Sequence, residues 1–116
     1  MRVIIAGSRS FKDWERLKKE VDLFIKNMSD VEIVSGGARG TDSYGEYYAA
    51  SNDLRLHKFL PDWGNFGKRA GLVRNRLMAQ FADACICFWD GKSRGTANMI
   101  KEANENNLEL RIIRVE

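Results

Sequence analysis

The predicted fold is decided by the stretch Val34-Ser35-Gly36-Gly37-Ala38-Arg39-Gly40-Thr41-Asp42. An apolar segment leads into this stretch, and residue types that begin helices end it. Three glycines in five positions remove the Cβ atoms that would hold a ligand away from the backbone. The free N–H groups of a helix start attract anions. We therefore interpret the stretch as the exit of a buried strand, a phosphate-binding turn and a helix N-terminus.

A second loop with the same ingredients is Trp89-Asp90-Gly91-Lys92-Ser93-Arg94-Gly95-Thr96, which follows a later apolar run. Each loop combines glycine, arginine and a Gly-Thr pair at a predicted helix start, and anion sites typically join N–H groups with guanidinium groups. One such loop is equally well explained as an ordinary tight turn, whereas two favour a nucleotide-like ligand cradled between them. Neither loop fits the Walker A pattern, and no Gly-x-Gly-x-x-Gly motif follows the first strand.

Outward from these loops, strand and helix patterns alternate along the chain. Apolar runs and one alternating segment, 54–60, predict strands at residues 2–6, 31–35, 54–60, 84–89 and 109–115. Helical spacing predicts helices at roughly residues 11–27, at residues 70–81 and at about residues 95–106. A further helix is expected after Thr41 or Asp42, with a frayed end near residues 51–53. A chain of 116 residues is expected to form a single domain, residues 1–116, and its successive parallel strands are expected to be joined by right-handed crossovers. Its fold is a three-layer α/β sandwich of about five parallel strands with helices on both faces.

Three local features of the sequence lead to further predictions. Ser10 with Asp13 resembles a capping box for the first helix, and Thr41 or Asp42 is expected to cap the second. Residues 61–71 hold the only proline and three glycines, so they are expected to form a long irregular loop, which is usually functional. The predicted helix 70–81 carries its apolar spacing at Val73, Leu77 and Phe81.

Size and composition are those of an ordinary soluble globular domain. A chain of 116 residues with 44% hydrophobic and 30% charged residues buries roughly 65% of its unfolded surface. No apolar run approaches the roughly 20 residues that cross a bilayer, and the first run is too short for a signal peptide. We therefore expect a cytoplasmic protein with no membrane partner. The net charge of +3 permits a polyanionic partner without strongly favouring one.

Nothing in the sequence predicts a metal site or a conventional catalytic residue. Cys85 and Cys87 are two apart in a predicted strand, so they share a face and are expected to pack as small hydrophobes. The only histidine, His57, is expected at the surface of an outer strand. No serine has an evident general base near it in sequence.

Parallel sheets of this kind bind ligands beyond the carboxyl ends of their strands, where the strand order reverses. Every glycine except Gly45 falls in a segment expected along or near that edge. The candidate ligand-binding residues there are Gly7, Ser8, Arg9, Ser35, Gly36, Gly37, Ala38, Arg39, Gly40, Thr41, Asp42, Asp62, Trp63, Arg74, Asn75, Asp90, Gly91, Ser93, Arg94, Gly95 and Thr96.

The charged and aromatic candidates have different expected roles. Four arginines from separate segments favour phosphate neutralisation, although each alone would be an ordinary solvated residue: Arg9, Arg39, Arg74 and Arg94. Asp42 and Asp90 are either helix caps or acceptors for ribose hydroxyls. Asp62, Trp63 or Asp90 is expected to contribute to ribose and base recognition, and Trp89 is at least as readily a core residue.

Five segments together resemble the SLOG superfamily, in its YspA or cpYpsA-related branch: VIIAGSRSF (3–11), VSGGARGTDSYGEYYA (34–49), PDW (61–63), AGLVRNRLMA (70–79) and CFWDGKSRGTANMI (87–100). The resemblance extends over essentially the whole chain. It implies a Rossmann-like fold that binds a nucleotide or nucleotide-derived small molecule, such as an NAD- or ADP-ribose-like species or a cyclic nucleotide. It further implies a bacterial or phage sensor or sequestering protein that forms a homodimer or higher homo-oligomer. We expect no required cofactor beyond that ligand.

Two other arms of the superfamily give less favoured alternatives. In LOG phosphoribohydrolases the corresponding loop reads Gly-Gly-x-Gly-Thr-x-x-Glu, and its Glu acts with an Arg to cleave a glycosidic bond. Met99 stands at the position of that Glu, and a thioether is no general base, although Arg74 or Arg76 could match the Arg. Glu102 would substitute only if the loop were shifted.

In the Smf/DprA arm, a Ser-Gly-x-Ala-Arg-Gly-x-Asp loop helps to bind single-stranded DNA, and residues 35–42 match it closely. The resemblance therefore implies single-stranded DNA as an alternative partner. The rest of the sequence shows no long basic stripe with interleaved aromatic residues, which such binding usually requires.

Overall fold

The structure is a computed structural model that describes residues 1–116. Its strands are β1 (Arg2–Gly7), β2 (Glu32–Ser35), β3 (Leu56–Lys58), β4 (Ala84–Trp89) and β5 (Glu109–Arg114). Its helices are α1 (Trp14–Ile25), α2 (Thr41–Ser51), α3 (Trp63–Phe66), α4 (Ala70–Phe81) and α5 (Arg94–Glu105), with a 3-10 turn at Gly67–Arg69. The strands form one parallel sheet in the order β3-β2-β1-β4-β5. The predicted Rossmann-like α/β fold is confirmed.

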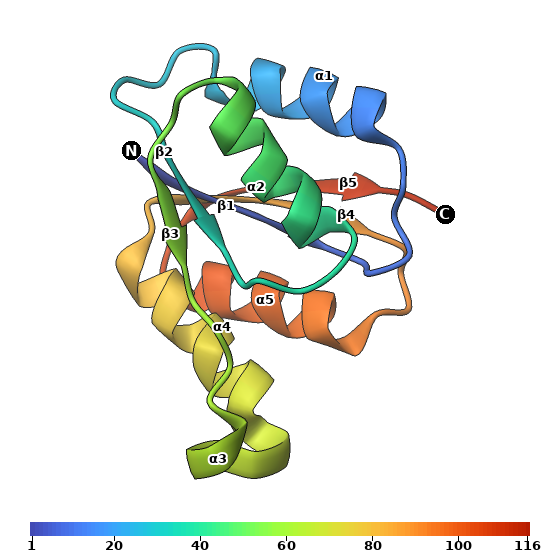
Figure 1. The fold of residues 1–116 in the computed structure, drawn as a ribbon, viewed down its shortest axis with the longest axis vertical. Helices are drawn as coiled ribbons and strands as arrows, with labels where there is room; N and C mark the ends of the chain where they lie inside the picture. The colour runs from blue at the N-terminus through green and yellow to red at the C-terminus, as the bar shows by residue number, and fades with distance from the viewer.

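The sheet is covered by α1 and α2 on one face and by α4 and α5 on the other (Figure 1). Successive side chains of a strand point to opposite faces. Val3 and Ile5 therefore join the core beneath α1 and α2, whereas Ile4 joins the core beneath α4 and α5. Cys85 and Cys87 lie in that second core and are fully buried, as predicted. Burial on both faces explains the continuous apolar runs of the central strands.

The helix details differ from the predictions at several points. Asp13 rather than Ser10 caps α1, because the Asp13 carboxylate accepts the Arg16 N–H at 3.1 Å. Gly40 occupies the N-cap position of α2, which has no side-chain cap. Leu77 of α4 is 49% exposed, and the residues that α4 buries are Ala70, Asn75, Met78 and Ala79. The apolar spacing was therefore wrong for Leu77, whereas Phe81 packs against the second core.

Residues 61–71 are not an irregular loop as predicted. Asp62 caps α3, since its Oδ1 accepts the N–H of Asn65 at 3.1 Å, and the chain continues through the 3-10 turn into α4. Figure 1 shows that α3 stands away from the sheet. Its two aromatic side chains are consequently exposed, Trp63 at 59% and Phe66 at 48%.

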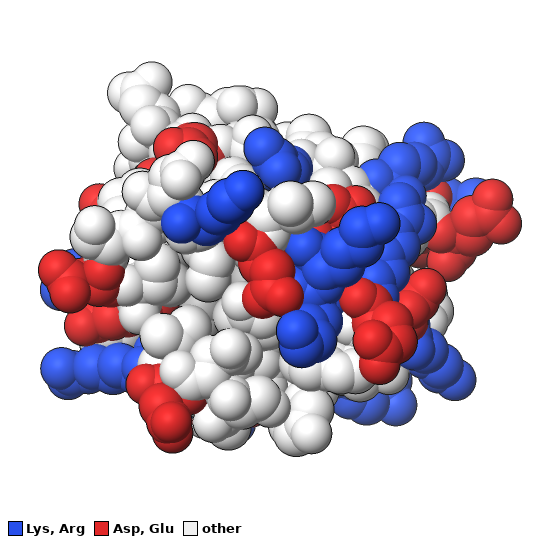
Figure 2. Space-filling view, turned by 90° about the horizontal axis from the view of Figure 1, so that it is seen from above, with Lys and Arg blue, Asp and Glu red and all other residues white.

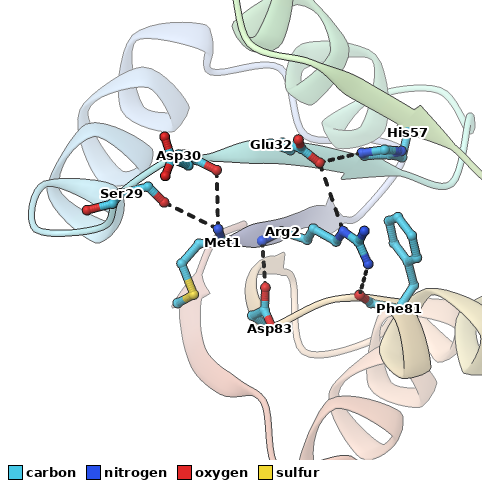
Figure 3. A network of polar contacts seen from close by, with 8 residues as sticks. All are labelled: Met1, Arg2, Ser29, Asp30, Glu32, His57, Phe81 and Asp83. Carbon is cyan, nitrogen blue, oxygen red and sulfur yellow. Dashed lines mark hydrogen bonds and ion pairs between the residues drawn. The ribbon is translucent and has the colours of Figure 1, made fainter.

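A polar network ties together the amino ends of four strands (Figure 3). Arg2 donates its backbone N–H to Asp83 at 2.8 Å and a guanidinium N–H to the carbonyl of Phe81. Glu32 Oε1 lies 2.7 Å from His57 Nε2. The His57 side chain is only 19% exposed and meets the Phe81 ring edge-on, so its predicted surface position was wrong. This network lies at the edge of the sheet opposite to the loops that follow β1, β2 and β4.

The face that carries α1 has no single-sign charge (Figure 2). Basic and acidic side chains are interleaved across that view, and within α1 Lys18 Nζ lies 3.1 Å from Asp22 Oδ2. Paired surface charges of this kind contribute little to binding or stability. No helix of the structure has the length and apolar character that crossing a membrane requires.

Substituting Gly40 by alanine tests the packing of the turn between β2 and α2. Gly40 has a φ of +72°, and a Cβ there would lie 2.2 Å from the carbonyl oxygen of Arg9. We expect Gly40→Ala to lower the free energy of unfolding by about 3 kcal/mol, measured by chemical denaturation, because a clash adds to backbone strain. Gly67→Ala is the matched control, since Gly67 also has a positive φ but open space around it. Equal losses in the two variants would contradict this packing.

Candidate functional site

The loops after β1, β2 and β4 meet at the point where the strand order reverses, between β1 and β4. Ser8 joins all three. Its N–H donates to the carbonyl of Phe88 at 2.9 Å, its carbonyl accepts the hydroxyl of Thr41 at 2.9 Å, and its Oγ accepts the N–H of Asp90 at 3.2 Å. Gly7 permits this approach, because a Cβ there would lie 2.3 Å from the carbonyl oxygen of Phe88.

A cavity of about 440 Å³ opens at this junction. Ala6, Met78 and Met99 are its apolar residues besides Ala38, and arginine, serine and aspartate side chains supply most of the rest. The predicted site residues that line it are Gly7, Ser8, Arg9, Ala38, Asp42, Arg74, Asn75, Asp90, Ser93, Arg94, Gly95 and Thr96. Three guanidinium groups in one concave site favour an anionic ligand.

A second cavity of about 390 Å³ adjoins the first on the side of α3. The predicted site residues that line it are Arg9, Gly36, Gly37, Ala38, Arg39, Trp63, Arg74, Asn75 and Gly95. Five of these line both cavities: Arg9, Ala38, Arg74, Asn75 and Gly95. The two cavities are therefore neighbours that share one wall, and all four predicted arginines line at least one of them.

Arg74 is the most constrained of these arginines. Its Nη1 donates to the carbonyl of Gly36 and its Nε donates to Asn75 Oδ1 at 2.9 Å. Burial lowers the pKa of Arg74, and the nearby charge of Arg9 lowers it further, while Asp42 acts in the opposite direction. Gly36 leaves room for this guanidinium, since a Cβ there would lie 2.6 Å from Arg74 Nη1. The Arg74 charge is thus held in place before any ligand arrives.

Asp42 fills the turn that the sequence assigned to phosphate. Its carboxylate accepts the N–H of Ala38 at 3.1 Å, and Ser35 Oγ accepts the N–H of Gly37 at 3.1 Å. Burial raises the pKa of Asp42 to about 6, although the hydrogen bond from Ala38 and the charge of Arg74 act to lower it. Two N–H groups of the turn are therefore already paired within the chain.

The start of α5 has two backbone N–H groups without a partner. Asp90 Oδ1 accepts the N–H groups of Lys92 and Ser93, both at 2.8 Å, which lowers the pKa of Asp90 and shapes the loop. Ser93 Oγ accepts the N–H of Thr96 at 3.3 Å as the N-cap. The backbone N–H groups of Arg94 and Gly95 have no acceptor within the protein. Gly95 lines both cavities with open space where a side chain would stand.

Five predicted site residues line neither of these cavities: Ser35, Gly40, Thr41, Asp62 and Gly91. They support the site instead. Ser35 donates its hydroxyl to Glu46 at 2.8 Å, Thr41 bonds Ser8, Asp62 caps α3, and Gly91 lies beneath the guanidinium of Arg114. Trp89 also has a supporting role, since its Nε1 donates to the carbonyl of Ser93 at 3.1 Å.

Several lining residues were not among the predicted site residues. Ser10, Met78 and Met99 line the first cavity, and Lys68 and Leu72 line the second. One signal was available: residues 71, 74, 75 and 78 fall on one face of a helix at three- and four-residue spacing, which places Met78 beside the predicted Arg74 and Asn75. Lys68 gave no such signal, because residues 61–71 were expected to be irregular.

The arginine-lined cleft lies at the reversal point of a parallel sheet, which is the position at which Rossmann-like domains bind their ligands. No group of three or more histidine, cysteine or carboxylate side chains is arranged to hold a metal ion. The family model of the YspA, cpYpsA-related SLOG family matches residues 1–66. A relative, the Gene 61 protein of Mycobacterium phage D29, is 34% identical and aligns over 94% of this chain and 93% of its own length. The chain belongs to this SLOG family.

Two solved structures share the fold. DNA processing protein A (DprA) from Streptococcus pneumoniae has a TM-score of 0.76 and 20% identity, and the match covers 99% of this chain but half of that protein. DprA from Helicobacter pylori, whose structure describes its binding of single-stranded DNA, has the same score and identity, with coverages of 100% and 66%. At 20% identity these matches establish the fold alone.

Substituting Asp42 by asparagine tests the buried carboxylate. Because the folded-state pKa of Asp42 is raised from 3.8 to about 6, the folded state binds the extra proton. The contribution of Asp42 to stability is therefore greatest below about pH 4 and falls as the pH rises through 6, by up to about 3 kcal/mol. The difference in unfolding free energy between wild type and Asp42→Asn should change by that amount between pH 4 and pH 7.

Asp62→Asn is the control for this pH dependence. Asp62 is exposed and its pKa is lowered by hydrogen bonds from Asn65, so its contribution changes with pH in the opposite direction. A difference between wild type and Asp42→Asn that stays constant from pH 4 to pH 7 would contradict the raised pKa of Asp42.

Proposed function

We propose that the protein binds a nucleotide or nucleotide-derived small molecule, with a phosphate group at the start of α5. The observation that carries the proposal is the pair of unpaired N–H groups at Arg94 and Gly95, which open into a cavity lined by Arg9, Arg74 and Arg94. Helix N-termini and guanidinium groups are the two elements that phosphate sites combine. The turn at Gly36 to Asp42 supports the site by holding Arg74, and the N–H groups of Gly37 and Ala38 are paired within the chain.

The rest of the cleft suits the remainder of a nucleotide. Asp90 lines the first cavity with a half-buried carboxylate whose remaining acceptor positions can take ribose hydroxyls, the role that an acidic residue has in dinucleotide sites. Trp63 lines the second cavity with a ring that is available for stacking on a base. No cofactor beyond this ligand is required in the proposal. The protein would act as a sensor or as a sequestering protein, in the bacterial cytoplasm or in that of a phage host.

Hydrolysis of the ligand has less support. Met99 lines the first cavity and is 1% exposed, so a thioether faces the position at which LOG enzymes present a glutamate. Glu102, the nearest carboxylate along α5, lies outside both cavities with its Oε1 3.5 Å from Arg76 Nε. On this reading the protein releases no free base from nucleoside monophosphates. Homo-oligomer formation, which the family resemblance implies, stays a prediction.

Calorimetric titration with AMP, ADP and ADP-ribose tests the proposal. We expect at least one of them to bind and Arg94→Gln to weaken it by tenfold or more, because a hydrogen bond to a charged group contributes about 1.5–3 kcal/mol. Lys19→Gln, which removes an exposed charge on α1, is the control and should bind as the wild type does. Failure of the wild type to bind any of the three, or equal affinities in Arg94→Gln and wild type, would contradict the proposal.

Single-stranded DNA is the second candidate ligand, and one observation favours it. Four adjoining hollows along the carboxyl edge are lined by nine basic side chains and three acidic ones. The basic residues are Arg9, Lys12, Arg16, Arg39, Lys68, Arg74, Lys92, Arg94 and Arg114. The sequence has no continuous basic stripe, but the fold gathers these residues from segments that are separate in sequence. Positive grooves with aromatic rings track single strands in other proteins.

The salt dependence of oligonucleotide binding tests this second candidate. For a thymidine oligonucleotide, the logarithm of the association constant should fall linearly with the logarithm of the salt concentration, by about 0.7 for each phosphate contacted. Lys92→Gln and Arg114→Gln should each reduce that slope by roughly this amount if the strand extends into the hollow that they line. Absence of binding at 50 mM salt would exclude the candidate.

A further inference from the structure

We infer that the ligand is two-ended: a dinucleotide-type molecule whose central pyrophosphate lies on the wall shared by the two cavities, with one ring system in each cavity. The inference rests on the proposed function and narrows it to one class of ligand. It does not follow from any single loop, because neither cavity alone distinguishes a mononucleotide from a longer molecule.

Part of the positive charge of the cleft lies between the cavities: Arg94 lines only the first and Arg39 and Lys68 only the second, but two arginines are shared. Arg9 and Arg74 line both, and Gly95 at the start of α5 lines both as well. The charge of Arg9 lowers the pKa of Arg74, so the two guanidinium groups are close enough to interact. Two guanidinium groups and a helix N-terminus on one wall match two adjacent phosphate groups better than one.

The two ends of the cleft differ in chemistry. The first cavity has the apolar side chains of Met78 and Met99 together with the carboxylate of Asp90, a combination that suits a ring and its ribose. The second has Trp63, Pro61 and Leu72, which offer an aromatic face and apolar edges to a base. Trp63 is 59% exposed, so most of its ring is free to be covered by a ligand. Each end therefore has its own partner for a ring system.

The volumes agree with this division. At about 440 and 390 Å³, each cavity falls within the range of roughly 300–1,000 Å³ that holds one small ligand. A mononucleotide that fills one cavity leaves the other to water. A two-ended ligand uses the apolar surface of both and makes the same contacts with the shared wall.

The test compares ADP-ribose and diadenosine pyrophosphate with AMP and ADP by calorimetric titration of the full chain. We expect at least one two-ended probe to bind tenfold or more tightly than ADP. Trp63→Ala, which alters only the second of the two cavities, and Asp90→Asn, which alters only the first, should each weaken that probe about fivefold or more. AMP occupies a single cavity, so it should be weakened by at most one of the two substitutions.

Phe66→Ala is the matched control, because Phe66 is an exposed aromatic residue on the same short helix as Trp63 but lines neither cavity. It should leave all affinities unchanged. AMP or ADP binding as tightly as the two-ended probes would overturn the inference and leave the proposed function standing. Equal losses in Phe66→Ala and Trp63→Ala would overturn the assignment of Trp63 and with it the inference. If none of the four probes binds, both proposals fail.

Discussion

The geometry of the cleft depends on the hydrogen bonds of Ser8, which hold three loops in fixed relative positions. Its carbonyl, N–H and hydroxyl reach the chain after β2, the end of β4 and the loop before α5. Ser8 is only 2% exposed, so water does not compete for these bonds, and the low local dielectric strengthens them. The groups that face the cavities are therefore positioned by buried contacts. A ligand does not have to order the loops, and less of its binding free energy is lost in doing so.

A second constraint on the cleft is the pair of charged side chains Asp42 and Arg74, which are both largely buried beside the wall that the two cavities share. Burial shifts the pKa of each toward its neutral form, upward for Asp42 and downward for Arg74. Their mutual attraction offsets only part of that shift in each case. An anion on the cavity side of Arg74 would give the guanidinium a further partner and would disfavour the Asp42 carboxylate. The proposed phosphate and the Asp42 proton would therefore favour each other.

The sequence predicted the fold well, because buried parallel strands and amphipathic helices leave plain patterns. The bounds of α4 and β4 matched the prediction, and the four arginines were correctly brought to one edge. The prediction from the sequence failed on α4 and in residues 61–71, where a local pattern favoured the wrong structure. On α4 the apolar spacing suggested that Leu77 is buried, whereas Asn75, Met78 and Ala79 are buried instead. The glycines at 64, 67 and 71 suggested a loop where the chain forms a capped helix. The sequence did not predict that the nine basic residues of the carboxyl edge lie together, because they are far apart along the chain.

The burial of Met99 adds a physical reason to the proposal that the site binds its ligand without turnover. Its side chain is buried in the cavity lining, so a carboxylate at that position would lose hydration unless a ligand supplied a positive centre. An oxocarbenium-like transition state supplies one, and a resting ligand does not. With methionine there, Met78 of α4 and Met99 of α5 give the first cavity two apolar side chains, which suit a neutral ring. In the proposed binding site, methionine at position 99 therefore lacks the carboxylate of the LOG loop and gives the first cavity an apolar contact in its place.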